Sequence, residues 1–139
     1  LPRCGHRRFV GSGHPVGCAV ALRTLQIIEE EAFPEQARVK GRYLLDALSA
    51  ALADHPHVGD IRGKGLMCAV ELVEDKRTKA AFPADRKVGS RVNRQTIERG
   101  LFSRIKGDTS LLAPPIVITN EEMDHAVGIL AESVKAVLG

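Results

Sequence analysis

The sequence predicts an α+β fold, in which helices cover one face of a small antiparallel sheet built of two hairpins. Three observations support this prediction. Apolar residues recur at helical spacing in four stretches, two pairs of short β-like runs are each separated by a glycine-containing turn, and the helical stretches flank the hairpins along the chain. The predicted order is helix, helix, hairpin, helix, hairpin, helix.

Two helices are expected in the first third of the chain. The first begins at Ser12 to Pro15, because a serine can cap a helix and proline suits its first turn. It is apolar on nearly all sides, so we expect it to be buried on more than one side, or to drive self-association where it is left uncovered. It ends in the acidic residues 29–31. The second helix runs from about 34 to 54.

The first hairpin follows the second helix. Residues 58–62 and 66–73 are rich in β-branched and aliphatic side chains, which predicts two strands. Gly63-Lys64-Gly65 between them predicts a tight turn. A polar loop over residues 74–85 then leads out of the hairpin.

A third helix is expected over about 84–99, with a glycine directly after it as its natural C-cap. Short strands over 101–104 and 111–113 enclose the turn at 106–108 and make the second hairpin. The last helix starts at a cap formed by Thr119 or the next residue, with acidic residues in its first turn.

Length and composition predict one globular domain with a small core, since the chain has 139 residues of which 44% are hydrophobic. We expect residues 12–139 to form that domain and residues 1–11 to be an irregular, polar leader. The net charge of +3 comes from lysines and arginines spread among acids, and aromatic residues make up only 4%, so a nucleic-acid partner is not expected. No apolar run approaches the length of a membrane span.

The cysteines indicate neither disulfides nor a zinc site. Cys4, Cys18 and Cys68 are odd in number, far apart and without a Cys-x-x-Cys pair. Cys18 and Cys68 lie in apolar runs, which is typical of small core residues. A reducing cytoplasm is therefore the expected compartment.

Arg104 is the strongest candidate for a binding residue. It is expected at the end of a strand, beside the flexible turn at Gly107. A guanidinium group pairs with a carboxylate through two parallel hydrogen bonds, so Arg104 could hold a substrate carboxylate in a cleft. The alternative is a surface arginine paired with Asp108.

No catalytic or metal-binding cluster is evident in the sequence. His55 and His57 flank a proline at a helix end without a third ligand, so we expect solvated loop histidines and no metal. Residues 62–65 lack the spacing of a phosphate-binding loop and do not lead into a helix, which favours a hairpin turn. His14 and His125 have no paired acid or nucleophile. The sequence assigns no catalytic residue.

Three segments in order resemble the C-terminal small domain of class III (fold type I) pyridoxal-phosphate aminotransferases. They are Ser12-Gly13-His14-Pro15, Arg62-Gly63-Lys64-Gly65, and the stretch from Gly100 through Arg104 and Asp108 to Thr119. The resemblance spans nearly the whole chain from Ser12 to Gly139, and it points most to the ω-amino-acid:pyruvate branch.

The resemblance implies transfer of an amino group from an amine or ω-amino acid to a keto acid such as pyruvate, with pyridoxal 5′-phosphate as the cofactor. It implies that Arg104 binds the substrate carboxylate and swings out for substrates that lack one. The family has a threonine at the position of Val10, which reaches the cofactor phosphate. Ser12 is left as a weak, displaced candidate for cofactor binding, with a helix cap as the alternative.

The family's Schiff-base lysine is expected in a large domain, since lysines such as Lys40, Lys64, Lys87 and Lys106 match no such strand motif. We therefore expect the chain alone to bind no cofactor and to be inactive. Its partners would be the missing large domain and a second copy of itself. The alternative is a stand-alone, non-catalytic α+β module for ligand binding or dimerisation, which would bury Arg104 against Asp108.

Overall fold

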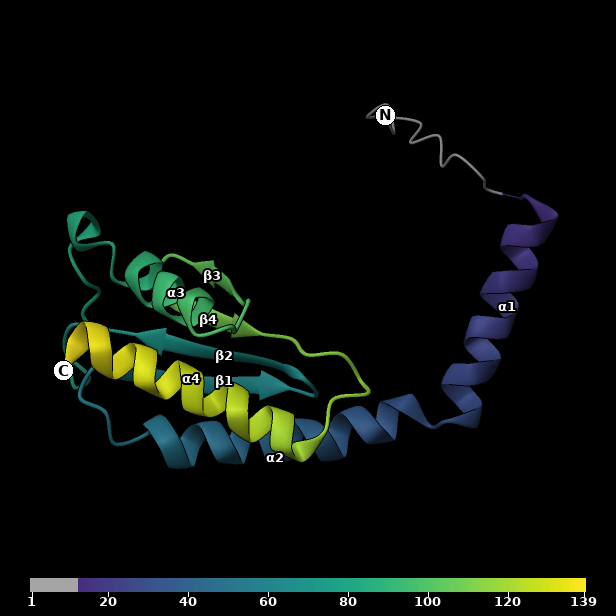
Figure 1. Cartoon of the computed structure of the whole chain (residues 1–139), viewed down its shortest axis with the longest axis horizontal. Coiled ribbons are helices and arrows are strands. Elements are labelled where there is room, and N and C mark those ends of the chain that lie inside the picture. The colour runs from purple at the N-terminus through teal and green to yellow at the C-terminus, as the bar shows by residue number, and fades with distance from the viewer. Residues whose placement is uncertain (1–12) are drawn as a thin grey trace. The chain divides into compact units, whose positions relative to one another are not determined.

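A computed structural model describes residues 13–139 (Figure 1). The chain divides into two compact units, residues 1–34 and residues 35–139, and each is described by itself. The expected leader and the candidate Ser12 lie outside the described residues. The predicted α+β class is confirmed, because a four-stranded antiparallel sheet is combined with helices.

The first unit contains one described element, the helix α1 (Pro15–Glu30). Pro15 stands in its first turn as predicted, and Arg23 donates two hydrogen bonds to the carboxylate of Glu30, at 3.0 and 3.2 Å. The prediction that this helix is buried on more than one side was wrong, because none of its residues is buried. Within its own unit, α1 has no other described element to pack against.

The second unit contains the sheet and the remaining helices. Its elements in chain order are α2 (Phe33–Leu52, starting at the unit boundary), β1 (Val58–Lys64), β2 (Met67–Leu72), the 3-10 turn η1 (Ala84–Arg86), α3 (Val88–Glu98), β3 (Arg104–Lys106), β4 (Thr109–Leu112) and α4 (Asn120–Leu138). This is the predicted order of two hairpins and their flanking helices.

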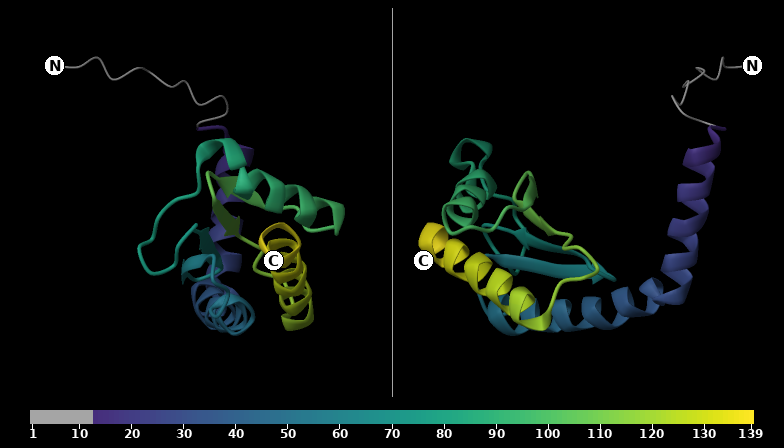
Figure 2. Two further views of the ribbon diagram at one scale, coloured as in Figure 1. Left: turned by 90° about the vertical axis from the view of Figure 1, so that its left-hand side faces the viewer. Right: turned by 45° about the vertical axis from the view of Figure 1, so that its right-hand side comes forward.

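The sheet has the strand order β1-β2-β4-β3, so the two hairpins join through β2 and β4. Its strands alternate between a buried face and an open face. The core lies between the buried face and the helices α2, α3 and α4, and Figure 2 shows α3 and α4 on one side of the sheet. The buried strand residues include Val58, Cys68, Val70, Leu72 and Leu112, which are 1–7% exposed. Within residues 35–139, no helix packs on the opposite face of the sheet, which is called the helix-free face below.

The cap expected from Thr119 or the next residue at the start of α4 is formed by Thr119, which makes a capping box with Glu122. The hydroxyl of Thr119 accepts from the backbone N–H of Glu122 at 3.2 Å, and the carboxylate of Glu122 accepts from the N–H of Thr119 at 2.9 Å. These two bonds satisfy N–H groups that have no partner within the helix. The helix therefore starts where the sequence places it.

The single helix predicted over 84–99 is interrupted. Lys87 adopts a left-handed conformation with φ of 45°, so η1 ends there and α3 begins at Val88. The side chain of Lys87 does not cap α3. Instead the carboxylate of Asp108, on the turn of the second hairpin, accepts from the backbone N–H of Gly89 at 2.7 Å. The start of α3 is thus set by a residue distant in sequence.

The strand boundaries shift by a few residues from those predicted. The first hairpin turns at Gly65, which has φ of +56°, whereas Gly63 lies within β1 opposite Cys68. The strand predicted over 101–104 begins only at Arg104. The N–H of Leu101 instead donates to the carbonyl of Thr96, so this segment still belongs to the C-terminal end of α3.

Candidate functional site

A recess of about 730 Å³ lies in the second unit, beside the first turns of α4. Residues 100–104 and 111–115 form one wall, and the side of α4 that carries Glu122, His125 and Ile129 forms another. The lining is mainly apolar, and it includes the exposed side chains of Met67 and Phe102, which are 73% and 86% exposed. The recess is therefore suited to an aliphatic or aromatic group.

Arg104 lines this recess as the first residue of the edge strand β3. Its cross-strand partner is Leu111, and its side chain is exposed. Among residues 13–139, no hydrogen bond or ion pair engages its guanidinium group. The alternative pairing with Asp108 is not found, because that carboxylate caps α3 through Gly89. A guanidinium with no partner among the described residues can bind an anion with the fork geometry that carboxylates prefer.

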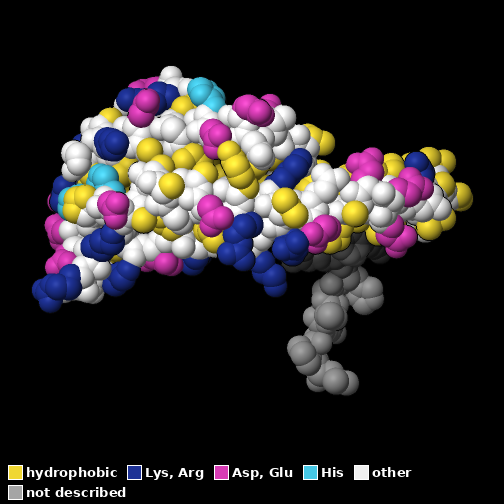
Figure 3. All heavy atoms as spheres, turned by 90° about the horizontal axis from the view of Figure 1, so that it is seen from below, with side chains coloured by type: hydrophobic (Ala, Val, Ile, Leu, Met, Phe, Trp, Pro, Cys, Tyr) yellow, Lys and Arg dark blue, Asp and Glu magenta, His cyan; other side chains and the backbone are white. Residues whose placement is uncertain are grey.

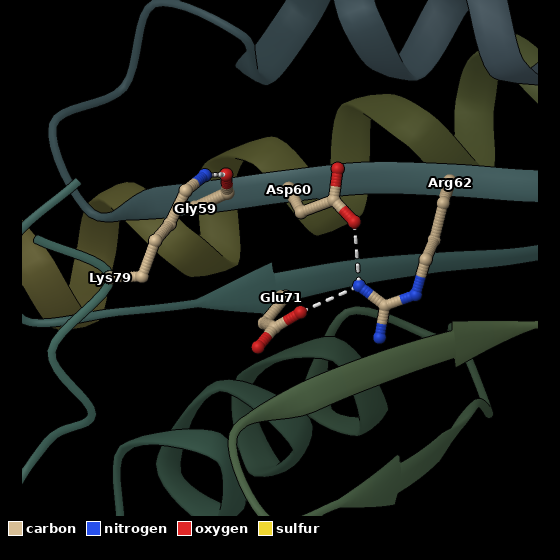
Figure 4. A network of polar contacts seen from close by, with 5 residues as sticks. All are labelled: Gly59, Asp60, Arg62, Glu71 and Lys79. Atoms are coloured by element: carbon tan, nitrogen blue, oxygen red, sulfur yellow. Dashed lines mark hydrogen bonds and ion pairs between the residues drawn. The ribbon is translucent and has the colours of Figure 1, made fainter. Parts of the chain in front are cut away.

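A second arginine on the helix-free face of the sheet, Arg62, is paired with two carboxylates. The guanidinium of Arg62 donates to the carboxylates of Asp60 at 2.7 Å and Glu71 at 2.6 Å, and these bonds raise the pKa of Arg62 (Figure 4). In the same region, the ammonium group of Lys79 donates to the carbonyl of Gly59. The segment 62–65 is thus part of a hairpin, as the sequence predicted.

Arg62 and Arg104 stand at opposite ends of one cross-strand row. The row runs from Arg62 through Ala69 and Leu111 to Arg104, because these residues are paired successively in the sheet. Their side chains therefore share the helix-free face. Of the two, Arg62 is paired with carboxylates, whereas Arg104 has no hydrogen bond or ion pair among residues 13–139.

The wall of the recess around Pro114 and Pro115 is held in place by α2. The ammonium group of Lys40 donates to the carbonyl of Ile116 at 2.6 Å. Next to it, the hydroxyl of Tyr43 donates to the carboxylate of Asp124 at 2.8 Å, and this bond raises the pKa of Tyr43. Neither contact could be predicted from a local pattern, since the partners are 76 and 81 residues apart.

The described residues of the recess do not fit pyridoxal phosphate by themselves. No lysine is among the residues that line it. The ammonium group of Lys40, nearby, donates a hydrogen bond to a backbone carbonyl. Those of Lys76 and Lys79 donate to backbone carbonyls elsewhere. The phosphate candidate Ser12 and the altered position Val10 lie outside the described residues. Of the two site residues predicted from the sequence, Arg104 is therefore the one that lies within the described residues.

The prediction of solvated loop histidines was wrong for His55 and His57, because both are half-buried. Within residues 13–139, no three His, Cys, Asp or Glu side chains converge as metal ligands would. Cys68 is buried as expected, and burial raises the pKa of its thiol, whereas Cys18 is exposed on α1.

Acidic, basic and hydrophobic side chains are interspersed on the face in Figure 3. None of the helices within residues 13–139 is long and apolar enough to cross a bilayer.

Comparison with known proteins gives one consistent family. The sequence profile of the family Aminotransferase class-III matches residues 10–134. An uncharacterised aminotransferase of Sinorhizobium fredii is 42% identical over 132 residues, which cover 94% of this chain and 28% of the relative. The putrescine–pyruvate aminotransferase of Pseudomonas aeruginosa is 39% identical over 119 residues, covering 86% of this chain and 26% of the relative.

Solved structures agree with the sequence comparison. A thermostable (S)-enantioselective ω-transaminase from Thermomicrobium roseum superposes with a TM-score of 0.84 at 42% identity, over 91% of this chain and 28% of that one. A thermostable ω-transaminase variant from Pseudomonas jessenii gives 0.84 at 40% identity, over 93% and 28%. The chain thus spans less than a third of the length of its relatives, consistent with their C-terminal part. The chain belongs to the class III aminotransferase family.

Proposed function

We propose that residues 12–139 are the C-terminal small domain of a pyridoxal-phosphate-dependent aminotransferase that moves an amino group from an amine or ω-amino acid to a keto acid such as pyruvate. The observation that carries this proposal is Arg104, which lines an apolar recess and whose guanidinium has no hydrogen bond or ion pair within residues 13–139. The similarity to a putrescine–pyruvate aminotransferase and to ω-transaminases supports the substrate class.

Arg104 binds the carboxylate of the keto acid or amino acid in this proposal. Two parallel hydrogen bonds from its guanidinium group would fix the carboxylate in one orientation, while Phe102 and Met67 offer apolar surface to the rest of the substrate. Because no described residue holds the guanidinium, the side chain can also turn away when the amino donor has no carboxylate. One recess then serves two kinds of substrate.

The cofactor chemistry belongs to the part of the protein that this chain does not contain. Pyridoxal phosphate supplies an electron sink in aminotransferases, and its Schiff-base lysine is expected in the large domain. We infer that the large domain covers the helix-free face of the sheet, where Arg104 lies, and that the chain alone has no transaminase activity. A reducing cytoplasm stays a prediction based on the use of cysteine.

Replacing Arg104 with glutamine is expected to lower kcat/KM for pyruvate by roughly 10- to 100-fold, because a hydrogen bond to a charged group contributes about 1.5–3 kcal/mol. The measurement uses a chimera in which residues 12–139 replace the equivalent part of the Thermomicrobium roseum ω-transaminase. The kcat/KM for an amine donor without a carboxylate should change much less.

Arg62→Gln is the matched control, since Arg62 shares the sheet face but is already engaged by Asp60 and Glu71. It should leave both rate constants close to those of the parent chimera. An equal loss for pyruvate and for the uncharged amine in Arg104→Gln would contradict the proposed role. Transaminase activity in the isolated 139-residue chain would contradict the prediction that the large domain is needed for the cofactor chemistry.

The alternative function, a stand-alone dimerisation module, is favoured by one observation on α1. Its large apolar side chains are exposed to solvent within the described structure: Val16, Val20, Leu22 and Leu25 are between 59% and 64% exposed. An exposed apolar helix favours association with another surface. Both functions therefore predict a second copy of the chain or another partner for α1.

The isolated chain is expected to self-associate, and Leu22→Glu is expected to shift it towards the monomer, because a charge on α1 opposes the burial of its apolar face. Sedimentation velocity at several protein concentrations measures this shift. Val39→Glu is the matched control, since Val39 is 54% exposed on α2. A wild-type chain that stays monomeric at high concentration would rule out this role for α1.

A further inference from the structure

The turn at residues 55–57 ties three elements of the second unit together. The backbone N–H of His55 donates to the carbonyl of Leu52 at the end of α2, at 3.1 Å. The carbonyl of His55 accepts from Val58 at the start of β1, at 3.2 Å, and the carbonyl of His57 accepts from Val73 just after β2, at 2.9 Å. A change within this turn therefore acts on the helix and on the first hairpin together.

The hydrogen bond inside the turn requires His55 to be neutral. The backbone N–H of His57 donates to Nδ1 of His55 at 3.2 Å. A ring nitrogen accepts a hydrogen bond only when it carries no proton, so the proton of the neutral ring is on Nε2. The bond closes the turn in the way that an asparagine side chain does two residues before the N–H it binds. Nε2 is buried and has no hydrogen-bond partner among the described residues.

His57 is held in a form that tolerates a second proton. Its Nδ1 lies 3.1 Å from the carbonyl oxygen of Val73 and 3.0 Å from that of Glu74. Because both partners are acceptors, Nδ1 carries a proton already, and protonation of Nε2 leaves these contacts intact. The ring of Phe82 packs at 5.4 Å from that of His57, measured between centroids. The two histidines thus differ in what a proton does to them.

The surroundings of His55 disfavour a positive charge. Burial lowers its pKa most, and the ring of His57 and the ammonium groups of Lys135 on α4 and Lys76 in the loop after β2 lower it further. The backbone carbonyl of Gly139 acts in the opposite direction. His55 therefore stays neutral in the folded protein at a pH where a free histidine is already charged.

We propose that the turn at residues 55–57 is a proton-sensitive switch: a proton taken up at Nδ1 of His55 breaks the hydrogen bond from the N–H of His57 and loosens the junction between α2, β1 and the end of β2. The ligand of this site is the proton itself. The inference depends on the geometry of the turn, so it stands independently of the aminotransferase function.

The direction of the pH effect follows from linkage. The pKa of His55 is lower in the folded chain than the value of about 6.5 expected in the unfolded chain. The unfolded chain thus binds the proton first, and the stability contributed by neutral His55 is complete above about pH 6.5. It is lost as the pH falls from there towards the folded pKa, by at most about tenfold in the unfolding constant per pH unit.

The test is urea unfolding of the full chain at pH 7.5, 6.5 and 5.5, followed by far-UV circular dichroism, for the wild type, His55→Asn and His57→Asn. Asparagine at position 55 keeps an acceptor for the N–H of His57 and cannot be protonated in this range. The unfolding constant of the wild type should rise relative to that of His55→Asn as the pH falls, by severalfold at pH 5.5. His57→Asn should keep a pH dependence of the same sign but a weaker one, because the ring of His57 contributes to the lowered pKa of His55.

If a variant fails to fold, an NMR titration of the histidine rings in the wild type tests the proposed protonation of His55 directly. We expect His55 to titrate below pH 6.5, with its Nδ1 unprotonated at pH 7.5, and the amide signal of His57 to shift with the same midpoint. The proposal is overturned if His55 titrates at pH 6.5 or above, or if His55→Asn shows the same pH dependence of unfolding as the wild type.

Discussion

Replacing Gly41 with alanine is expected to lower the free energy of unfolding by about 3 kcal/mol. Gly41 lies in the middle of α2, and a Cβ atom there would stand 2.2 Å from the carbonyl carbon and oxygen of Gly65 and 2.6 Å from its Cα. These are backbone atoms of the first hairpin turn, so no side chain can rotate out of the way. The clash outweighs the gain of about 1 kcal/mol that alanine has over glycine in a helix.

Gly128→Ala is the matched control for this prediction. Gly128 lies within α4, and a Cβ atom there would meet nothing within 4 Å. At this position only the higher helix propensity of alanine affects stability, so the free energy of unfolding should rise by up to about 1 kcal/mol. Urea unfolding of both variants and the wild type measures the two effects. A Gly41→Ala variant as stable as the wild type would show that α2 and the turn do not make this close contact.

The element order could be predicted because it depends on signals within single segments. Thr119 and Glu122 form a cap whose partners are three residues apart, and the hairpins follow from β-rich runs with glycine between them. The break at Lys87 could not be predicted in this way. It depends on the carboxylate of Asp108, which lies 19 residues from its partner Gly89 and becomes a helix cap only after the hairpin has folded.

The candidate site, too, could be predicted only where it depends on signals within a single segment. The position of Arg104 on a strand next to a glycine turn follows from local pattern, and in the structure Arg104 begins β3 and lines the recess. The sequence suggests Asp108 as a partner for Arg104, but in the structure the carboxylate of Asp108 accepts a hydrogen bond at the start of α3. The half-burial of His55 depends on α4 and on the loop after β2, which no local pattern brings to the turn.

Gly89→Ala is the second replacement with a large expected effect, again a loss of about 3 kcal/mol. A Cβ atom at Gly89 would lie 2.2 Å from the carbonyl oxygen of Gly107 and 2.9 Å from the Cα of Asp108, both in the turn between β3 and β4. The turn must move away from α3 to make room. Because Arg104 starts the strand that enters this turn, the movement reaches the candidate site as well as the core.

A double-mutant cycle with Asp108→Ala separates this movement from a simple loss of packing. In the wild type, Asp108→Ala removes the charged acceptor at the start of α3 and should cost about 1 kcal/mol, the usual effect of losing a helix cap. If Gly89→Ala displaces the turn, that hydrogen bond is already broken in the variant. Asp108→Ala should then cost little in the Gly89→Ala background, with a coupling energy of at least about 0.5 kcal/mol. Strictly additive costs would mean that α3 accommodates the methyl group without moving the turn, and that the position of Arg104 does not depend on Gly89.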